Sequence, residues 1–296
     1  NRLDHLQKTI HTVLQNNEAI NTELYIFADG HRENRPNDFQ KVSEVRNYIK
    51  GITGFKKIEI LEQSINQGLA KSIISGVTYV LQRHPTVIVL EDDMEVSSQF
   101  LKYMNSNLAL YENDESVISI HGYIYPIPAT LPNSFFLKGA DCWGWATWRR
   151  GWKLFNENGQ YLYDEIARQG RISEFNFWNS YDYYGMLKNQ IDGKVNSWAI
   201  RWYASAFLNN KLTLYPGKSM VKNIGFDNSG EHCGSDDRFL VSNNGSIKFD
   251  EKVKPVEDLN SKLKIAQFFK SLEKKTFSKK ELCLIKFNIK IKKIFC

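Results

Sequence analysis

Three adjacent carboxylates, Glu91, Asp92 and Asp93, directly follow the apolar run 87–90. Like charges a few ångströms apart repel one another, so such a cluster needs a positive partner. Carboxylate oxygens suit Mg²⁺ or Mn²⁺, and an ion held by one or two carboxylates usually completes its shell with phosphate oxygens and water. The cluster therefore predicts a Mn²⁺ or Mg²⁺ ion that joins the protein to a diphosphate. A lysine partner or a solvated acidic turn is the alternative.

A further ligand candidate is His232, in the Gly- and Asn-rich segment 223–234. This composition is typical of a loop. A neutral imidazole in the loop could complete a Mn²⁺ shell, because Mn²⁺ accepts nitrogen more readily than Mg²⁺ does. A surface histidine without a ligand role is the alternative.

The segment 66–72, Asn-Gln-Gly-Leu-Ala-Lys-Ser, stands at the start of a predicted helix. Gly68 permits a close approach of the backbone, and the free amides at a helix N-terminus attract an anion or a polar ligand edge. The segment is thus a candidate binding loop, although it could simply begin the helix.

Asp141 lies between Gly139 and the tryptophans Trp143, Trp145 and Trp148. A carboxylate beside aromatic walls is a candidate general base. Alternatively, Asp141 caps a helix that starts near Trp143. Aromatic residues crowd between 135 and 215, where they either offer flat faces to a sugar or a base or form a bulky core.

The segments that must position these residues alternate between helix and strand. Apolar spacing predicts helices over 3–14, 39–49 and 66–81, and strands over 24–27, 58–61 and 87–90. Such alternation implies an α/β fold with a mostly parallel sheet and flanking helices. Ligands bind outside the carboxyl ends of the strands in open sheets of this kind. Asp29 and the cluster 91–93 would then share one rim.

A doubly wound domain normally begins with a strand, whereas this chain begins with Asn1-Arg2, which reads as the loop that follows such a strand. We therefore expect the first strand to be missing and the true start to lie upstream. After residue 100 the alternation becomes irregular, with strands predicted over 117–121 and 212–215 and mostly helix over 161–191.

The composition is that of an ordinary globular protein, with 42% hydrophobic and 24% charged residues. From residue 261 onward eleven Lys oppose two Glu, so the first 260 residues carry a net charge of −3 within the total of +6. A nucleic-acid-binding surface over the fold is therefore not expected. The basic amphipathic tail could lie on an anionic membrane surface, or remain solvated.

The four cysteines form no regular pattern, and no apolar stretch approaches the length of a membrane span. These features suit a cytoplasmic location, free or peripheral on the inner face of the membrane. Because the true start is expected upstream, the lack of a visible targeting segment carries little weight.

This order of features resembles the GT-A (Rossmann-like) fold of inverting family 2 glycosyltransferases. The segment 89–95, Val-Leu-Glu-Asp-Asp-Met-Glu, is similar to the Glu-Asp-Asp segment of N-acetylglucosaminyltransferase I. Segments 139–148 and 197–202 resemble bacterial transferases of surface-polysaccharide gene clusters. The likeness covers about residues 1–235. It implies a nucleotide-sugar-binding part over 1–138, an acceptor and catalytic part over 139–245 and a basic tail over 246–296.

The resemblance also implies roles for single residues. Donor-binding residues would be Arg2, Asp29, Asn66, Gly68, Lys71, Glu91 and Asp92, with Asp29 facing the base of a nucleoside-diphosphate sugar, most simply a UDP-sugar. Metal ligands would be Asp93 and His232. Flat faces for a sugar acceptor would come from Trp143, Trp145 and Trp198.

The catalytic base of the relative lies in a Trp-Asp-Asp-Trp segment. The nearest match here is 195–198, which holds Asn196 and Ser197 where carboxylates are expected. Neither side chain can act as a base near neutral pH. We therefore assign the base to Asp141, with Asp182 in reserve.

The function implied is a metal-dependent inverting transfer of a hexosyl or N-acetylhexosaminyl group to a glycan or lipid-linked glycan in surface polysaccharide synthesis. A sugar nucleotidyltransferase shares this sheet and metal chemistry, but the sequence has no Gly-rich loop with a basic residue for a triphosphate. A non-catalytic carbohydrate-binding protein of the same fold is the other alternative, and Asn196 keeps it open.

Overall fold

The computed structural model describes residues 1–227, 237–243 and 251–295. Its N-terminal part alternates helix and strand within three residues of the predicted bounds. The elements are α1 (Leu3–Leu14), β1 (Glu23–Ala28), α2 (Asp38–Lys50), β2 (Lys57–Glu62), α3 (Leu69–Arg83) and β3 (Thr86–Val89), with a short 3₁₀ helix over Asn17–Asn21. The helix and strand predictions for this part of the chain are confirmed.

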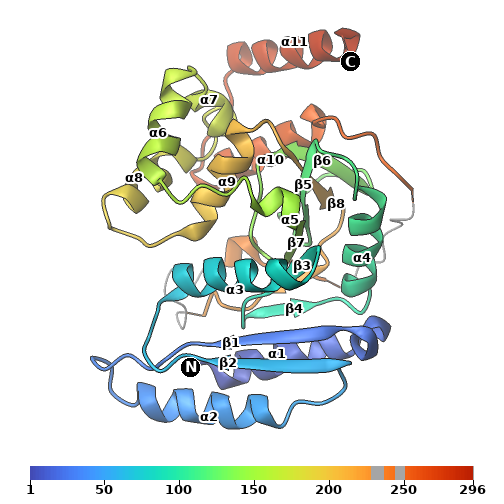
Figure 1. The fold of residues 1–296 in the computed structure, drawn as a ribbon. Helices are drawn as coiled ribbons and strands as arrows, with labels where there is room; N and C mark the ends of the chain where they lie inside the picture. The colour runs from blue at the N-terminus through green and yellow to red at the C-terminus, as the bar shows by residue number, and fades with distance from the viewer. Residues whose placement is uncertain (228–236, 244–250, 296) are drawn as a thin grey trace.

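The described strands form three separate sheets rather than one. β1 and β2 pair in parallel, and together with α1 and α2 they form the lower part of Figure 1. The larger sheet has the order β3-β7-β5-β8-β6 and contains β5 (Val117–His121), β6 (Ser134–Lys138), β7 (Trp145–Trp148) and β8 (Leu212–Pro216). A short pair of β4 (Met94–Val96) and β9 (Val221–Asn223) lies beside it.

The prediction of a mostly parallel sheet is wrong for the described strands. Among neighbouring strands of the larger sheet only β5 and β8 pair in parallel. β7 pairs antiparallel with both β3 and β5, and β6 pairs antiparallel with β8. Parallel neighbours need a long crossover connection, usually a helix. β6 and β7, which the short loop 139–144 connects, both run opposite to β3, β5 and β8, and each lies beside strands of that other direction.

A cavity of about 1500 Å³ lies between the pair β1-β2 and the larger sheet. The facing edges of β1 and β3 pair with no other strand among the described residues, and both strands line the cavity along their whole length. Apolar side chains of α1 and α3, including Ile10 and Val77, complete its walls. The carboxyl ends of β1 and β3 lead into the same end of the cavity, where Asp29 and the cluster 91–93 lie.

Helices pack around the larger sheet and bury most of the aromatic residues. They are α4 (Phe100–Leu110), α5 (Arg149–Trp152), α6 (Gly159–Arg168), α7 (Ile172–Phe175), α8 (Tyr183–Ile191) and α9 (Trp198–Leu208), followed by a 3₁₀ turn over Asp237–Phe239. Trp145 and Trp202 are fully buried, with Trp152 and Trp198 packed against them. Much of the aromatic crowding therefore forms core, as the alternative interpretation held.

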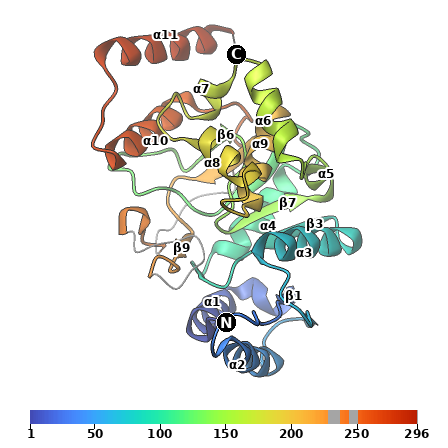
Figure 2. The same ribbon diagram turned by 90° about the vertical axis from the view of Figure 1, so that its left-hand side faces the viewer.

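The C-terminal region holds α10 (Leu259–Leu272) and α11 (Lys279–Phe295). Figure 2 shows α10 alongside the body of the molecule, whereas α11 lies at its outer edge. Ile265 and Phe269 of α10 are 0% and 1% exposed and belong to the same core cluster as Phe207 of α9. The part of the predicted basic tail that forms α10 therefore packs its apolar face into the fold.

Candidate functional site

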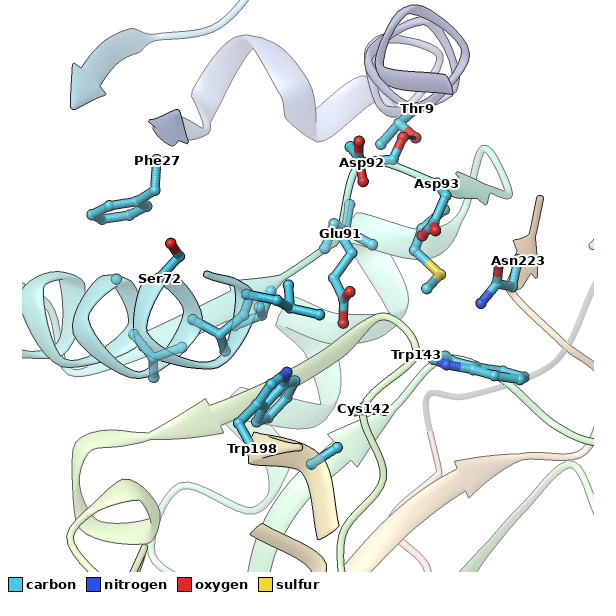
Figure 3. A pocket seen from close by; sticks show the side chains of 18 of the residues that line it. Thr9, Phe27, Ser72, Glu91, Asp92, Asp93, Cys142, Trp143, Trp198 and Asn223 are labelled. Carbon is cyan, nitrogen blue, oxygen red and sulfur yellow. Dashed lines mark hydrogen bonds between the residues drawn. The ribbon is translucent and has the colours of Figure 1, made fainter. Parts of the chain in front are cut away.

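The cavity brings most of the predicted site residues together. Its lining includes Arg2, Asp29, Asn66, Gly68, Glu91, Asp92, Asp93, Asp141, Trp143 and Trp198. Lys71 and Trp145 are not among the described residues that line it. Figure 3 shows Glu91 reaching into the cavity toward the side of Cys142 and Trp198, while Asp92 lies beside Thr9 of α1.

The positive partner of the acidic cluster is Arg2, which immediately precedes α1. Its Nη1 lies 2.9 Å from Asp93 Oδ2, its Nε donates to Asp92 Oδ2 over 3.3 Å, and its Nη2 donates to Asp92 Oδ1. The hydroxyl of Thr9 donates to the backbone carbonyl of Asp92 over 2.9 Å. The first turns of α1 are therefore fastened to the end of β3, and one guanidinium neutralises part of the carboxylate repulsion.

The remaining carboxylate oxygens retain capacity for a cation. Asp93 is 7% exposed, and its Oδ1 is buried with no hydrogen-bond partner among the described residues. Desolvation raises the pKa of Asp93. Desolvation, followed by the charges of Asp93 and Asp92, raises the pKa of Glu91 to about 8. An ion that reached these oxygens would relieve this electrostatic cost, since it would favour their charged forms.

The carboxylates at this site can hold a hard divalent ion only if a bound diphosphate supplies some of the oxygen ligands of that ion. Within the described residues no group of three or more His, Cys, Asp and Glu side chains is arranged to hold a metal. Asp93 and Asp92 supply carboxylate oxygens, which suit Mg²⁺ or Mn²⁺ bound through one or two carboxylates plus phosphate oxygens. The other predicted ligand, His232, lies outside the described residues.

A segment distant in sequence covers Asp93. The backbone N–H of Ile224 donates to the Asp93 carbonyl over 2.8 Å, directly after β9. At Gly225 a Cβ atom would lie 2.2 Å from Asp93 Oδ2, so a side chain there would require Asp93 to shift. His5 of α1 lies on the same segment, with Nε2 3.3 Å from the Ile224 carbonyl oxygen. No pattern in the sequence predicts this contact, because β4 and β9 are only three residues long.

Asp29 organises the loop before α3. Its Oδ1 accepts from the backbone N–H groups of Gly30 and Gln67 over 2.8 and 2.7 Å, and its Oδ2 accepts from that of Gly68 over 2.9 Å. Gly68 has φ +78°, in the left-handed region that favours glycine. Asn66 Nδ2 donates to the Gly30 carbonyl over 2.8 Å. Asp29 thus joins the end of β1 to the start of α3. Its carboxylate oxygens can still accept a further hydrogen bond.

Asp141 is held in the loop between β6 and β7 with its side chain 26% exposed. Its Oδ1 accepts from the N–H of Cys142 over 2.9 Å, and its Oδ2 accepts from the hydroxyl of Tyr125 over 3.0 Å. The helix-cap alternative does not apply, because the residues that follow form strand β7. Asp182 does act as a cap, since it accepts from the N–H of Gly185 at the start of α8 over 2.9 Å.

The aromatic residues divide between cavity wall and core. Trp145 is 0% and Trp198 2% exposed, and their rings stack with centroids 5.5 Å apart. Trp145 is therefore part of the core, whereas Trp198 also lines the cavity, so its acceptor role stays a prediction. Trp143 is half-buried and lines the cavity with its ring 4.7 Å from that of Tyr123.

Part of the wall was not anticipated from the sequence. Around α8 and the start of α9 the cavity is lined by Tyr181, Met186, Asn189 and Asn196. These residues are exposed or half-buried. Their spacing carries no catalytic signal, so only the fold reveals that they face the same space as Asp141.

Comparison with known proteins agrees with this geometry in the N-terminal part. A family profile described as "GNT-I family", that of N-acetylglucosaminyltransferase I, matches residues 1–124. The match supports a glycosyltransferase, and with it a nucleotide-sugar donor and a glycan acceptor. It spans the Arg2 contact, Asp29 and the cluster 91–93 but ends before Asp141. No match is found among curated proteins.

Proposed function

We propose that the chain is a metal-dependent inverting glycosyltransferase that moves a sugar from a nucleoside-diphosphate sugar, most simply a UDP-sugar, to a glycan or lipid-linked glycan acceptor. The observation that carries the proposal is Asp93 Oδ1, which is buried and has no hydrogen-bond partner within the described part of the chain, in the cavity that also contains Asp141. Synthesis of a surface polysaccharide is the process that fits the resemblance of segments 139–148 and 197–202.

The donor side of the cavity has the charge that a nucleotide diphosphate needs. Arg2, Arg32, Arg35 and Arg46 all line it. Arg32 is oriented by Asp38, with its Nη2 3.1 Å from Asp38 Oδ1. Guanidinium groups bind phosphate oxygens through paired hydrogen bonds. The loop that Asp29 fastens to α3 would lie against the base and ribose.

Asp93, together with Asp92, would hold Mn²⁺ or Mg²⁺. When bound, such an ion supplies Lewis-acid neutralisation of the charge that develops on the leaving diphosphate. Arg2 keeps both carboxylates in place and adds a fixed positive charge on the same side. A GlcNAc donor is the first to test, because the matched family profile is that of an N-acetylglucosaminyltransferase.

Asp141 would act as the general base. It takes the proton from an acceptor hydroxyl as that oxygen forms a bond to the anomeric carbon, while the bond from that carbon to the diphosphate oxygen breaks on the opposite face. The nucleoside diphosphate leaves with the bonding electron pair, and the anomeric configuration inverts. Tyr125 and the Cys142 N–H hold the carboxylate during this step.

The acceptor would lie against Trp143 and the wall formed by Tyr181, Met186, Asn189 and Asn196. This wall joins an aromatic ring to two amide side chains, the combination that binds an uncharged sugar by stacking and hydrogen bonding. Trp198 would border this wall, whereas Trp145 is buried and is not among the described residues that line the cavity.

The experiment that tests the function is a screen of nucleotide sugars in the presence of Mn²⁺, with release of the nucleoside diphosphate as readout. Release of UDP from one UDP-sugar, abolished in Asp93→Ala, supports the proposal. Release of pyrophosphate from a nucleoside triphosphate and a sugar phosphate would instead identify a nucleotidyltransferase. Sugar binding without turnover of any donor would identify a carbohydrate-binding protein.

The surface of α11 gives a reason to propose that the protein associates peripherally with an anionic membrane. Leu284 and Phe287 are 55% and 59% exposed on this helix, and Lys280, Lys286 and Lys290 are exposed around them. None of the helices in the described ranges has the length and apolar character needed to span a bilayer. A helix of this kind binds through shallow burial of apolar side chains and attraction of lysines to lipid head groups.

A further inference from the structure

A buried histidine stands directly behind Asp141. His121 is the last residue of β5 and is 0% exposed, with its Nε2 3.8 Å from Asp141 Oδ2. Neither of its ring nitrogens has a hydrogen-bond partner among the described residues. Buried polar groups are nearly always hydrogen-bonded, because an unsatisfied one keeps its desolvation penalty. An unsatisfied imidazole beside a candidate base therefore needs an explanation.

The backbone holds His121 where it is. Its place in β5 is opposite Trp145 of β7. The next residue, Gly122, donates its N–H to the Gly144 carbonyl over 2.7 Å, and a Cβ at Gly122 would lie 2.8 Å from that oxygen. The imidazole packs edge-on against the ring of Tyr215, with centroids 5.0 Å apart. A carboxylate oxygen of Asp141 lies within 4 Å of the ring.

The charge state of His121 suits a hydrogen-bond donor of fixed orientation. Burial lowers its pKa to about 4, although the charge of Asp141 opposes this shift. The ring is therefore neutral near pH 7 and carries one N–H. With the proton on Nε2, that N–H is on the side of the ring nearest Asp141.

Asp141 has room for this additional contact. A carboxylate offers about four acceptor positions, and two are taken by the Cys142 N–H on Oδ1 and the Tyr125 hydroxyl on Oδ2. A third would face His121. The fourth would remain for the hydroxyl that the substrate brings into the cavity.

We propose that His121 is a positioning residue, whose neutral imidazole donates to Asp141 Oδ2 and holds this carboxylate in the orientation that removes the acceptor proton. The inference rests on the proposed function, in which Asp141 is the base. The separation of 3.8 Å exceeds a hydrogen bond by less than an ångström. Catalytic hydrogen bonds are often long without ligand and shorten when substrate binds.

The contact itself is tested without turnover, by recording the ¹⁵N signals of the histidine rings in the wild type and in Asp141→Asn. We expect the Nε2–H tautomer for His121 in the wild type and a clear shift of its ring signals in the variant. Exposed His11 of α1 serves as the control and should not move. Signals of His121 that do not respond to Asp141→Asn, or an Nδ1–H tautomer, would overturn the proposal.

The role in catalysis is tested by a double-mutant cycle on the hydrolysis of UDP-N-acetylglucosamine, with UDP release as readout. His121→Phe should lower kcat by about 10- to 100-fold and change KM by less than about twofold, because only orientation is lost. His121→Gln, which keeps a donor, should retain more activity. In Asp141→Asn, the further change His121→Phe should have no additional effect.

The outcomes separate the inference from the function on which it rests. Additive losses in the cycle, or an equal loss of kcat in His121→Gln and His121→Phe, would contradict the positioning role. A full kcat in Asp141→Asn would show that Asp141 is not the base, and the proposed mechanism would then fail together with this inference. If the protein does not hydrolyse UDP-N-acetylglucosamine, the ¹⁵N signals of the His121 ring still show whether the contact with Asp141 exists.

Discussion

At the scale of single residues, the contact between Arg2 and the carboxylates of Asp92 and Asp93 carries the most electrostatic weight. The side chain of Arg2 is 17% exposed and that of Asp93 is 10% exposed. Arg2→Ala leaves two adjacent carboxylates without their guanidinium, so the free energy of unfolding should fall by about 1–3 kcal/mol. Urea unfolding measures this loss. Arg168→Ala, which removes an exposed ion pair on α6, should change little, and an equally stable Arg2→Ala would contradict this account of the cluster.

His121 makes the stability depend on pH. Its folded-state pKa of about 4 lies below the ordinary value of 6.5, so between these values the unfolded chain binds a proton that the folded chain does not. The stability that comes from keeping His121 neutral is present above pH 6.5 and is lost as the pH falls toward 4, by up to about 3 kcal/mol. The groups that face the ring are Asp141, Tyr123 and Tyr215.

The matched measurement is the difference in unfolding free energy between the wild type and His121→Phe at several pH values. The wild type should lose stability relative to the variant as the pH falls from 6.5 to 4, since phenylalanine does not titrate. A difference that is constant over this range would contradict the assignment of a buried neutral histidine.

The residue-scale predictions from sequence succeeded where charge alone demands an explanation. Three adjacent carboxylates require a positive partner, whatever the fold, and the structure supplies Arg2 for two of them. The identity of that partner was not predictable, because Arg2 lies 90 residues from Asp92 in the sequence. The buried state of Trp145 and the place of His121 behind Asp141 depend equally on the sheet order, which no local pattern encodes.

At the scale of elements, β9 and the residues after it form the cover of the acidic cluster. Gly225→Ala would place a Cβ atom 2.2 Å from Asp93 Oδ2, well inside van der Waals contact. We expect a loss of about 1–3 kcal/mol in stability and weaker binding of UDP in the presence of Mn²⁺. Gly51→Ala is the control, because its Cβ would be 3.5 Å from the nearest atom. Unchanged thermal unfolding and UDP binding in Gly225→Ala would show that this segment does not pack on Asp93.

Elements with a clear pattern of apolar residues were predictable from the sequence, whereas very short elements were not. α1, α2 and α3 carry apolar residues at helical spacing, and β1 to β3 are short apolar runs between them, so both their type and their order followed from the sequence. β4 and β9 are three residues long, and β6 and β7 lie in aromatic segments without a clear alternation. Their reversed direction made the larger sheet mostly antiparallel, which the pattern of the first 90 residues could not indicate.

At the scale of the whole molecule, the basic and apolar surface of α11 predicts association with anionic lipid. Leu284→Glu combined with Phe287→Glu should weaken binding to vesicles that contain phosphatidylserine by about tenfold or more, because both the shallow burial and the net charge change. Binding of the wild type should also weaken as salt is raised. Flotation of protein with vesicles measures both effects.

The control for this prediction is Ile20→Glu, a change of an apolar side chain that is 64% exposed at the other end of the chain. It should bind vesicles like the wild type. Equal flotation of the α11 variant and the wild type would contradict a membrane role for this helix.

The central claim is that Asp93 and its neighbours bind a nucleoside diphosphate together with a divalent ion. Calorimetric titration of UDP in the presence of Mn²⁺ tests it most directly, with Asp93→Ala as the matched variant. We predict binding by the wild type that needs Mn²⁺ and a loss of at least about 100-fold in affinity in Asp93→Ala. No binding by the wild type, or equally tight binding by Asp93→Ala, would contradict the account.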